Sequence, residues 1–488
     1  MLSWKPTAGP AKWLPNKVQN MESLSIQALK FIYCTVMVLL LFNLTIFVHE
    51  YGHYLLARWR KLKVDEFSLW FGPPIWQKKI GDVLFSLRSI PLGGYVKLPQ
   101  LQPDDPIEGK SEIPKEELPY ARPIDRIPTL FAGSFFNMLF AILIASILWV
   151  VGIPVDKSFT DTTIGYVPDQ SVEAAAGLRV GDKIIAINGI AVQDWLDIKA
   201  ETVFANSTAI DVSVLRNGKV ETVRFEPSKN ALGIREIQSE PKQTIVVHEL
   251  VRDMPAERAG FQLDDVMITF DGQADLTINQ LMSSIATQPG KECSVVVDRH
   301  GKRVTLHVTP EFNASEKKGM IGVKFGDSET ALIHPNPVKQ ITEVVLQMTR
   351  IVNAIFHQKQ TGIGVKDLSG PIGIIDILYN AVASDIRLAL YFLVLLNVNL
   401  AIINLLPLPV LDGGHIVFTL LEWVRKKPLN QRLMEGIQTA FVILLLAFVV
   451  YVSFNDVKRL RIMHGFKPKE ANEKNIQPPP ATQPAANK

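Results

Sequence analysis

Four long apolar segments constrain this chain more than any other feature of its sequence. In lipid, every backbone polar group must be paired within the protein, so about 20 consecutive apolar residues cross a bilayer as a helix. The first segment ends in polar groups rather than at a small-residue cleavage site, which favours a retained helix over a signal peptide. We predict a polytopic α-helical membrane protein with four transmembrane helices, approximately at 31–57, 129–152, 386–406 and 437–454.

Composition and cysteine content exclude several other functions. The 488 residues carry a formal net charge of +3, and no motif of a nucleic-acid-binding protein occurs, so we expect no nucleic-acid partner. The two cysteines, Cys34 and Cys293, lie far apart and form no metal or redox spacing.

The distribution of lysine and arginine predicts the orientation in the membrane. The loop 58–127 carries twelve of these residues, and the loop 407–436 carries a second cluster. Positively charged loops stay in the cytoplasm, so the large middle segment 153–385 and both termini are expected on the other side. The basic C-terminal tail argues against this orientation.

The middle segment contains an internal repeat. "AAAGLRVGDKIIAINGIAV" (174–192) and "ERAGFQLDDVMITFDGQAD" (257–275) align without a gap, with Gly177 over Gly260, 83 residues apart. Each copy combines alternating strand residues with an Asn-Gly or Asp-Gly hairpin turn. Both copies resemble PDZ domains, which implies a groove beside a strand edge for an extended peptide or a chain terminus. The alternative is a pair of β-rich spacers without peptide capture.

Two features follow the repeat. Six apolar residues recur at helical spacing, and this stripe faces either the protein core or the membrane surface. "LSGPIGI" (368–374) is predicted to be a turn or loop, and the Pro-rich end "NIQPPPATQPAANK" is predicted to be disordered. The residues of the stripe are Val338, Ile341, Val345, Met348, Val352 and Ile355.

The first apolar segment ends in a metal-binding motif. His49, Glu50 and His53 form H-E-x-x-H, which places both imidazoles on one face of a helix. Zinc suits two imidazoles with an open position for water, and the intervening glutamate can act as the general base. The alternative is a pair of helix-surface histidines, which is costly at the end of a membrane span.

A third zinc ligand is expected from the other membrane half, "NVNLAIINLLPLPVLDGGH" (397–415). Asp412 is the acidic residue of this stretch, and it follows two prolines that break the helix. A carboxylate oxygen is a good zinc ligand. His415 is a rival ligand, and an Asp-Gly turn at the membrane edge is the alternative without a metal.

The combination of H-E-x-x-H, a PDZ-like repeat and "NLLPLPVLDG" resembles the site-2 protease family, the intramembrane zinc metalloproteases of peptidase family M50. Within this family the bacterial regulator-of-sigma-E protease branch is the best match, over about residues 30–460. The resemblance implies that His49, His53 and Asp412 bind Zn2+ and that Glu50 is the general base. It also implies that Asn399 and Asn404 bind substrate, although asparagines equally join transmembrane helices.

The first loop contains "FSLWFGPPIWQ" and "FSLRSIPLGGYVKL", which in this family form a β-hairpin sheet that enters the membrane. An open strand edge near zinc could hold an unwound substrate by β-augmentation. We expect Gly93, Gly94 and Tyr95 to contact the substrate, with close backbone approach at the glycines. The alternative is a cytoplasmic hairpin without a role in substrate binding.

The second span departs from the family pattern, because it begins "AGSFFN" where relatives usually have a proline after Ala-Gly. Gly133, Ser134 and Asn137 still fit close helix packing. The departure concerns the shape of the gate and leaves the predicted chemistry unchanged.

The predicted protein is an intramembrane metalloendopeptidase of the bacterial inner membrane, with periplasmic PDZ domains and an active site near the cytoplasmic side. The resemblance implies single-pass substrates in the lipid bilayer: an anti-sigma factor after a first cleavage, and remnant signal peptides. A PDZ scaffold and a metal transporter are the rival functions, and neither needs a general base at Glu50. The predicted organisation is an N-terminal extension (1–28), a membrane half (29–152) that includes the hairpin loop (62–100), two PDZ domains (158–238 and 239–328), an amphipathic helix and linker (335–384), a second membrane half (385–456) and a C-terminal tail (457–488).

Overall fold

The computed structural model describes residues 16–101, 118–119, 121–230, 233–274, 276–313, 316, 318–327 and 330–463. Within this part of the chain, four helices are long and apolar enough to cross a membrane, which confirms the prediction from the apolar segments. The predicted disordered end and residues 1–15 lie outside the described residues. The four helices are α1 (Asn16–Trp59), α2 (Pro123–Val151), α10 (Ile386–Asn404) and α12 (Gln431–Met463).

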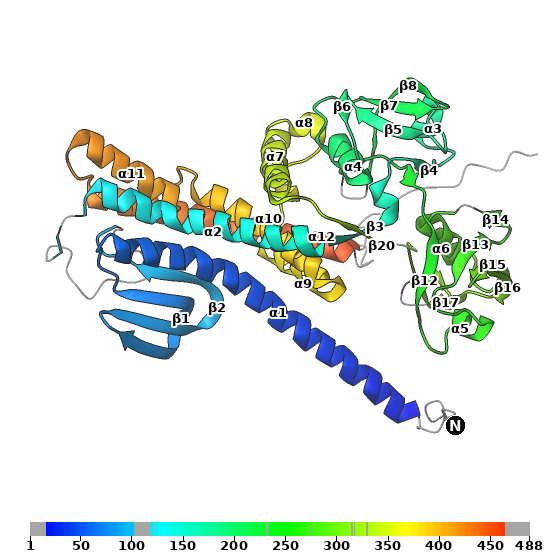
Figure 1. The fold of residues 1–488 in the computed structure, drawn as a ribbon, viewed down its shortest axis with the longest axis horizontal. Coiled ribbons are helices and arrows are strands. Elements are labelled where there is room, and N and C mark those ends of the chain that lie inside the picture. Colours follow the sequence, from blue (N-terminus) through cyan, green and yellow to red (C-terminus); the bar gives the residue numbers. More distant parts are fainter. Residues whose placement is uncertain are drawn as a thin grey trace, which may run out of the picture.

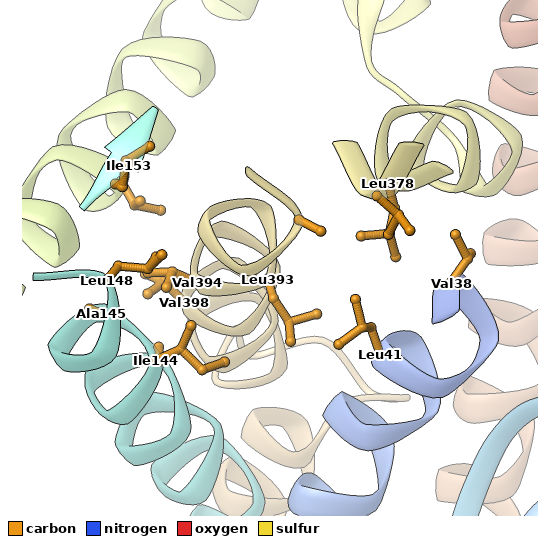
Figure 2. Close-up of a cluster of buried hydrophobic side chains, with 14 of the residues drawn as sticks. Val38, Leu41, Ile144, Ala145, Leu148, Ile153, Leu378, Leu393, Val394 and Val398 are labelled. Atoms are coloured by element: carbon orange, nitrogen blue, oxygen red, sulfur yellow. The ribbon is translucent and has the colours of Figure 1, made fainter. Parts of the chain in front are cut away.

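The core of the membrane part lies where α1, α2 and α10 meet. Figure 2 shows Leu41 of α1, Ile144 and Leu148 of α2, and Leu393 and Val398 of α10 gathered between these helices. All five side chains are buried, whereas many apolar side chains on the outer faces of the same helices are exposed. Such exposure is expected of helices whose outer faces meet lipid. The buried side chains between α1, α2 and α10 hold these three helices together.

Strands β1 (Glu66–Ile80) and β2 (Val83–Lys97) form an antiparallel sheet beside the C-terminal half of α1 (Figure 1). Each strand bends, so that 66–69 pairs with 84–87 on one side and with 94–97 on the other. Trp70 and Gly72, with φ of 71° and 86°, mark the bend in β1. The hairpin is therefore a sheet of four segments, and 94–97 is one of its edges.

The amphipathic helix predicted after the repeat is α7 (Pro337–Phe356). Its buried positions are Gln340, Val344 and Ala354, and Gln340 donates to the carbonyl of Ala145 in α2 at 3.0 Å. Ile341 and Val345 of the predicted stripe pack partly against the core, whereas Val338 and Val352 are exposed.

The prediction of a turn or loop at 368–374 is wrong for most of this segment. Helix α9 (Pro371–Ser384) begins there with a proline at its first turn, where the missing N–H costs no hydrogen bond. The N–H groups of Gly370 and Gly373 donate to the buried carboxylate of Asp456 in α12, at 3.2 and 2.9 Å. This long-range cap is not visible in the local sequence.

Two β-rich units with the same order of helices and strands follow α2. β5 of the first unit begins at Lys183 and β13 of the second at Val266, a difference of 83 residues, and the same offset separates the starts of the other matched elements from α3 and α5 to β11 and β19. The first unit comprises β4 (Ile164–Tyr166), α3 (Val172–Ala176), β5 (Lys183–Ile187), β6 (Ile190–Ala191), α4 (Trp195–Phe204), β7 (Ile210–Arg216), β8 (Lys219–Phe225), β9 (Ser228–Lys229), β10 (Arg235–Glu236) and β11 (Glu240–Pro241). The second unit comprises β12 (Ile245–Leu250), α5 (Pro255–Ala259), β13 (Val266–Phe270), β14 (Gln273–Ala274), α6 (Ile278–Thr287), β15 (Cys293–Arg299), β16 (Lys302–Val308), β17 (Glu311–Asn313), β18 (Lys318–Met320) and β19 (Val323–Asp327).

A short two-stranded sheet joins both units to the membrane part. β3 (Ile153–Asp156), directly after α2, pairs with β20 (Thr330–Ile333), directly before α7. The chain therefore leaves and re-enters the membrane part through one neck, beyond which both units lie (Figure 1).

Candidate metal centre

Helix α1 presents the H-E-x-x-H motif toward α2 and α10. His49 and His53 are one turn apart and only 8% and 7% exposed. Their Nε2 atoms lie 3.2 Å from each other. The helical spacing therefore brings two imidazole nitrogens to one point, as the sequence predicts.

Asp412 reaches the same point from the other membrane half. Helix α10 ends at Asn404, and the chain turns back through the Pro-rich segment before α11 (Asp412–Arg425) begins. A Cβ at Gly413 or Gly414 would lie 2.3 Å or 2.1 Å from a backbone carbonyl oxygen, so the turn requires glycine at both positions. Asp412 therefore enters the site from the first turn of a helix whose start is tightly packed.

The three side chains have the geometry of a metal-ligand set. Asp412 Oδ2 lies 3.3 Å from His49 Nε2 and 3.4 Å from His53 Nε2. A tetrahedral ion with bonds of about 2.0–2.1 Å holds its ligand atoms roughly 3.3 Å apart. Asp412 Oδ2 is also buried without a hydrogen-bond donor. Two imidazoles and one carboxylate at these separations fit a zinc ion, and His415 is not part of this cluster.

Helix α2 supports both histidines from behind. His53 Nδ1 lies 2.8 Å from the carbonyl oxygen of Thr129, and His49 Nδ1 lies 3.2 Å from the amide of Asn137. A histidine that binds a metal through Nε2 carries its proton on Nδ1 and needs an acceptor there. Asn137 Oδ1 is buried without a partner, and turning this amide over would give His49 that acceptor.

These supporting groups were not predicted from the sequence. Asn137 was interpreted as a helix-packing residue, although an asparagine within an apolar span is a recognised signal of a functional site. Thr129 acts through its backbone carbonyl, which leaves no signal in the sequence. Gly133 is required for space, because a Cβ there would lie 2.3 Å from His53 Nε2.

Glu50 lies between the two histidines in the sequence and faces the β1–β2 sheet. The backbone N–H of Val96 faces its carboxylate. A Cβ at Gly94 would lie 3.4 Å from Glu50 Cγ, so strand segment 94–97 passes directly beside this side chain. The carboxylate is therefore oriented by the hairpin and lies beside the metal-ligand cluster.

Similarity to known proteins extends over most of the chain and includes all of these residues. The profile of peptidase family M50 matches residues 37–448. The chain belongs to peptidase family M50. The resemblance to the site-2 proteases that was predicted from the motifs is thereby confirmed.

Matches to curated proteins cover 85% of this M50 peptidase and nearly the whole length of the relatives. It is 31% identical to the regulator of sigma E protease of Haemophilus influenzae over 445 residues, which is 85% of this chain and 96% of the relative. It is 28% identical to the regulator of sigma-E protease RseP of Escherichia coli over 440 residues, with the same shares covered. A Neisseria meningitidis protein, named as a candidate zinc metalloprotease, is 31% identical over 447 residues, again with shares of 85% and 96%.

The two predicted substrate-binding asparagines, Asn399 and Asn404, differ in their contacts. Asn404, the last residue of α10, has its amide nitrogen 3.3 Å from His49 Nε2 and so borders the cluster. Asn399 Oδ1 is buried without a hydrogen-bond partner. A neighbouring asparagine, Asn397, joins two helices instead, because its amide donates to Thr45 Oγ1 at 3.1 Å.

The three predicted hairpin residues also differ. Gly94 lies on the edge segment beside Glu50. Gly93 has φ of 84°, and a Cβ there would clash with the ring of Phe71. Tyr95 is only 5% exposed, and its hydroxyl donates to Glu66 at 3.0 Å. Of the three, Gly94 is therefore the residue placed closest to the cluster.

Proposed function

We propose that this M50 peptidase is an intramembrane zinc endopeptidase that cuts single-pass membrane proteins within or beside their span. The proposal depends on the convergence of His49, His53 and Asp412 on one point, with Glu50 beside them. The two histidines and Glu50 lie on α1, which is long and apolar enough to span a bilayer. The zinc metalloprotease name of the Neisseria meningitidis relative supports the choice of metal.

The chemistry follows from the ligand set and the carboxylate. When bound, zinc would act as a Lewis acid that polarises the scissile carbonyl and makes water more acidic. Glu50 accepts the proton of the attacking water and returns it to the leaving amine. Asn404, at the border of the cluster, is placed to donate its amide to the substrate carbonyl oxygen.

The edge segment 94–97 is the proposed docking strand for the substrate. Peptide bonds of a transmembrane helix are already hydrogen-bonded, so the helix must unwind before water can reach them. The carbonyl of Lys97 accepts from Asp65 within the sheet at 3.0 Å, so the backbone groups of Gly94 and Val96 point the opposite way, to the free edge. An extended substrate paired there would pass beside Glu50.

The proposed substrates are an anti-sigma factor already shortened by another protease, and remnant signal peptides. The names of the Haemophilus influenzae and Escherichia coli relatives, both regulators of sigma E, support this choice. The charges of the loops 58–127 and 407–436 support an inner-membrane orientation with the active site near the cytoplasmic side and the β-rich units in the periplasm.

The two β-rich units are proposed to be PDZ domains that act as a size filter. Their position beyond a single neck supports a role in excluding substrates with large external domains. Deleting residues 160–325 leaves the β3–β20 ladder intact to close the neck. We expect this variant to cut full-length substrates that the intact protein rejects, in a cleavage assay with tagged substrates. Unchanged selectivity would refute the filter.

The central experiment is Glu50→Gln in the purified protein. This change removes the base but none of the three metal ligands, so zinc content should stay at the wild-type level while cleavage of a tagged membrane substrate is lost. A metal transporter or a scaffold would keep its function after the same change. Cleavage at the wild-type rate would overturn the assignment of the base.

The ligand set is tested by a matched pair of substitutions. Asp412→Ala should lose zinc, because it removes one of three ligands, whereas His415→Ala, three residues along the same helix, should retain it. Elemental analysis of both purified variants provides the measurement. The reverse result would transfer the third ligand to His415.

A further inference from the structure

A buried ion pair lies inside the β1–β2 sheet, outside the metal-ligand cluster. The Glu66 carboxylate is 6% exposed and accepts from Arg88 Nη2 at 2.7 Å and from the Tyr95 hydroxyl at 3.0 Å. The Ser86 side chain faces it. One carboxylate therefore ties the segment 66–69 to Arg88, which follows the segment 84–87, and to Tyr95 in the edge segment beside Glu50.

The remaining donors of Arg88 complete this network. Its Nε donates to Ser68 Oγ at 3.1 Å, its Nη1 donates to the carbonyl of Gly72 at 2.8 Å, and its guanidinium lies 5.6 Å from the centre of the Tyr95 ring. Burial opposes the ionisation of Glu66, yet its donors hold the pKa of this carboxyl below its usual value. Burial and the neighbouring Glu66 charge raise the pKa of Tyr95 to about 12. The network therefore keeps a charged carboxylate and a protonated phenol at neutral pH.

Tyr95 lies between the two residues that touch Glu50. Its side chain is anchored inside the sheet by Glu66, while the backbone of its neighbours Gly94 and Val96 points to the free edge. The Val96 N–H faces the Glu50 carboxylate, and a Cβ at Gly94 would lie 3.4 Å from Glu50 Cγ. The anchor and the two contacts are adjacent in one short strand, so a movement of the anchor is transmitted to Glu50 directly.

We propose that Glu66, Arg88 and Tyr95 are positioning residues that hold the edge segment in place, so that this segment, packed beside Glu50 at Gly94, keeps the Glu50 carboxylate directed at the metal-ligand cluster. This inference rests on the proposed function in one respect only, the identity of Glu50 as the base. A purely structural core would be served as well by apolar residues, because a buried ion pair loses much of its attraction to desolvation. What the ion pair adds is a defined geometry, which an orienting partner of an active-site group requires.

The kinetic test uses Tyr95→Phe, which removes one hydroxyl and keeps the ring. Loss of an orienting hydrogen bond at a metal site costs about 10–100-fold in activity. We expect kcat to fall by about that factor while KM and zinc content stay unchanged. Asp82→Asn is the matched control: it breaks an exposed ion pair, Arg58 to Asp82 at 2.7 Å, that also ties the hairpin to α1, and kcat should not change. A wild-type kcat in Tyr95→Phe, or an equal loss in the control, would overturn the inference.

A second measurement does not depend on activity. A Cβ at Gly94 would lie 3.2 Å from Ile46 Cγ2, so the pair Ile46→Cys and Gly94→Cys is close enough to form a disulfide. In a chain whose native cysteines Cys34 and Cys293 are replaced by alanine, we expect rapid cross-linking, which is lost when Tyr95→Phe is added. Equal cross-linking in both backgrounds would show that the anchor does not hold the edge segment. If the wild-type protein cuts no membrane substrate, the proposed function fails, and this measurement still decides the role of the anchor.

Discussion

The two β-rich units share an arginine–aspartate pair at matching positions of the sequence repeat. In the first unit, Arg216 donates to both oxygens of Asp182 at 2.7 and 2.6 Å and to the carbonyl of Gly177. In the second, Arg299 binds Asp265 twice at 2.7 Å and the carbonyl of Gly260. Each pair joins the last residue of one strand (β7 or β15) to the turn before another (β5 or β13). The repeat therefore preserves the same ion pair in both units.

The units differ where the longer helix (α4 or α6) packs against a short strand (β10 or β18). In the first unit the side chain of Arg235 is buried there and donates to the carbonyls of Ser207 and Thr202 at 2.6 and 2.8 Å. Lys318, the matching residue of the second unit, is partly exposed and forms an ion pair with Glu316. A cavity of about 270 Å³ lies next to β18, and its lining includes Lys318, Met282, Ile285, Ala286, Gly319 and Phe325.

In these two units a shared fold does not imply a shared binding capacity. The arginine–aspartate pair is common to both units, whereas the residue at one matching position differs: Arg235 is buried against α4 in the first unit, and Lys318 lines an open cavity in the second. If the units are PDZ domains, as we propose, the second one is the better candidate for binding an extended peptide.

The largest expected effect on stability comes from breaking the arginine–aspartate pair of either unit. Asp182→Ala and Asp265→Ala each remove the buried carboxylate that an arginine binds with two hydrogen bonds, which costs about 3–5 kcal/mol when the pair is buried. Each change should raise hydrogen exchange in its own unit and leave the other unit protected, measured by mass spectrometry on the full chain. Exchange that rises in both units would show that they do not unfold independently. Glu221→Gln, at an exposed partner of Arg216, is the control and should have little effect.

The next largest effect on stability is expected at Arg235, the buried arginine of the first unit. Arg235→Ala leaves the carbonyl of Thr202 buried without its donor, which costs about 1–3 kcal/mol. Lys318→Ala in the second unit should change stability by less than about 0.5 kcal/mol, because Lys318 lies at the surface. Thermal unfolding of the full-length variants compares the two. Equal losses would contradict the difference between the units.

A glycine of the second unit provides a comparable test. A Cβ at Gly319 would lie 2.5 Å from the carbonyl oxygen of Ile285, so Gly319→Ala must push α6 away from β18, at a cost of about 1–3 kcal/mol. Glu236, the matching residue of the first unit, already has an exposed side chain, and Glu236→Ala should be neutral. Protease resistance of the two variants measures the difference. A resistant Gly319→Ala protein would mean that the helix is not held against the strand.

The smallest effect concerns the attachment of the first unit to α7. Arg350 of α7 forms an ion pair with Glu201 of α4 at 2.7 Å, and Asn353 contacts Asn206. Arg350→Gln should cost about 0.2–1 kcal/mol, because the pair is partly exposed. Cross-linking between α7 and the first unit should become less efficient, whereas Lys339→Gln, at an exposed pair within α7, serves as the control. No change in cross-linking would show that the ion pair does not hold the unit.

Much of the membrane fold could be predicted because it depends on local sequence. The four spanning helices follow from apolar length alone, and the helical spacing of His49 and His53 follows from their separation by four residues. The start of α9 could not be predicted, because its cap comes from Asp456, which is 86 residues from Gly370 in the chain. The loop prediction failed at this point for that reason.

The candidate site was predicted by residue type and not by geometry. The motif indicated which groups bind a metal, and the assignment of Asp412 as the third ligand stays a prediction until the metal is measured. The supporting contacts with Thr129 and Asn137 depend on how α1 packs against α2, which no pattern within either helix specifies.

The sequence by itself determined the membrane spans, the metal-binding motif and the repeat, because each depends on residues close together in the chain. Only the fold shows that Asp412 rather than His415 lies against the two histidines, that the hairpin edge lies beside Glu50, and that Arg235 is buried against α4. These outcomes require segments that are distant in sequence to pack together, and side-chain packing of that kind is decided by the whole fold.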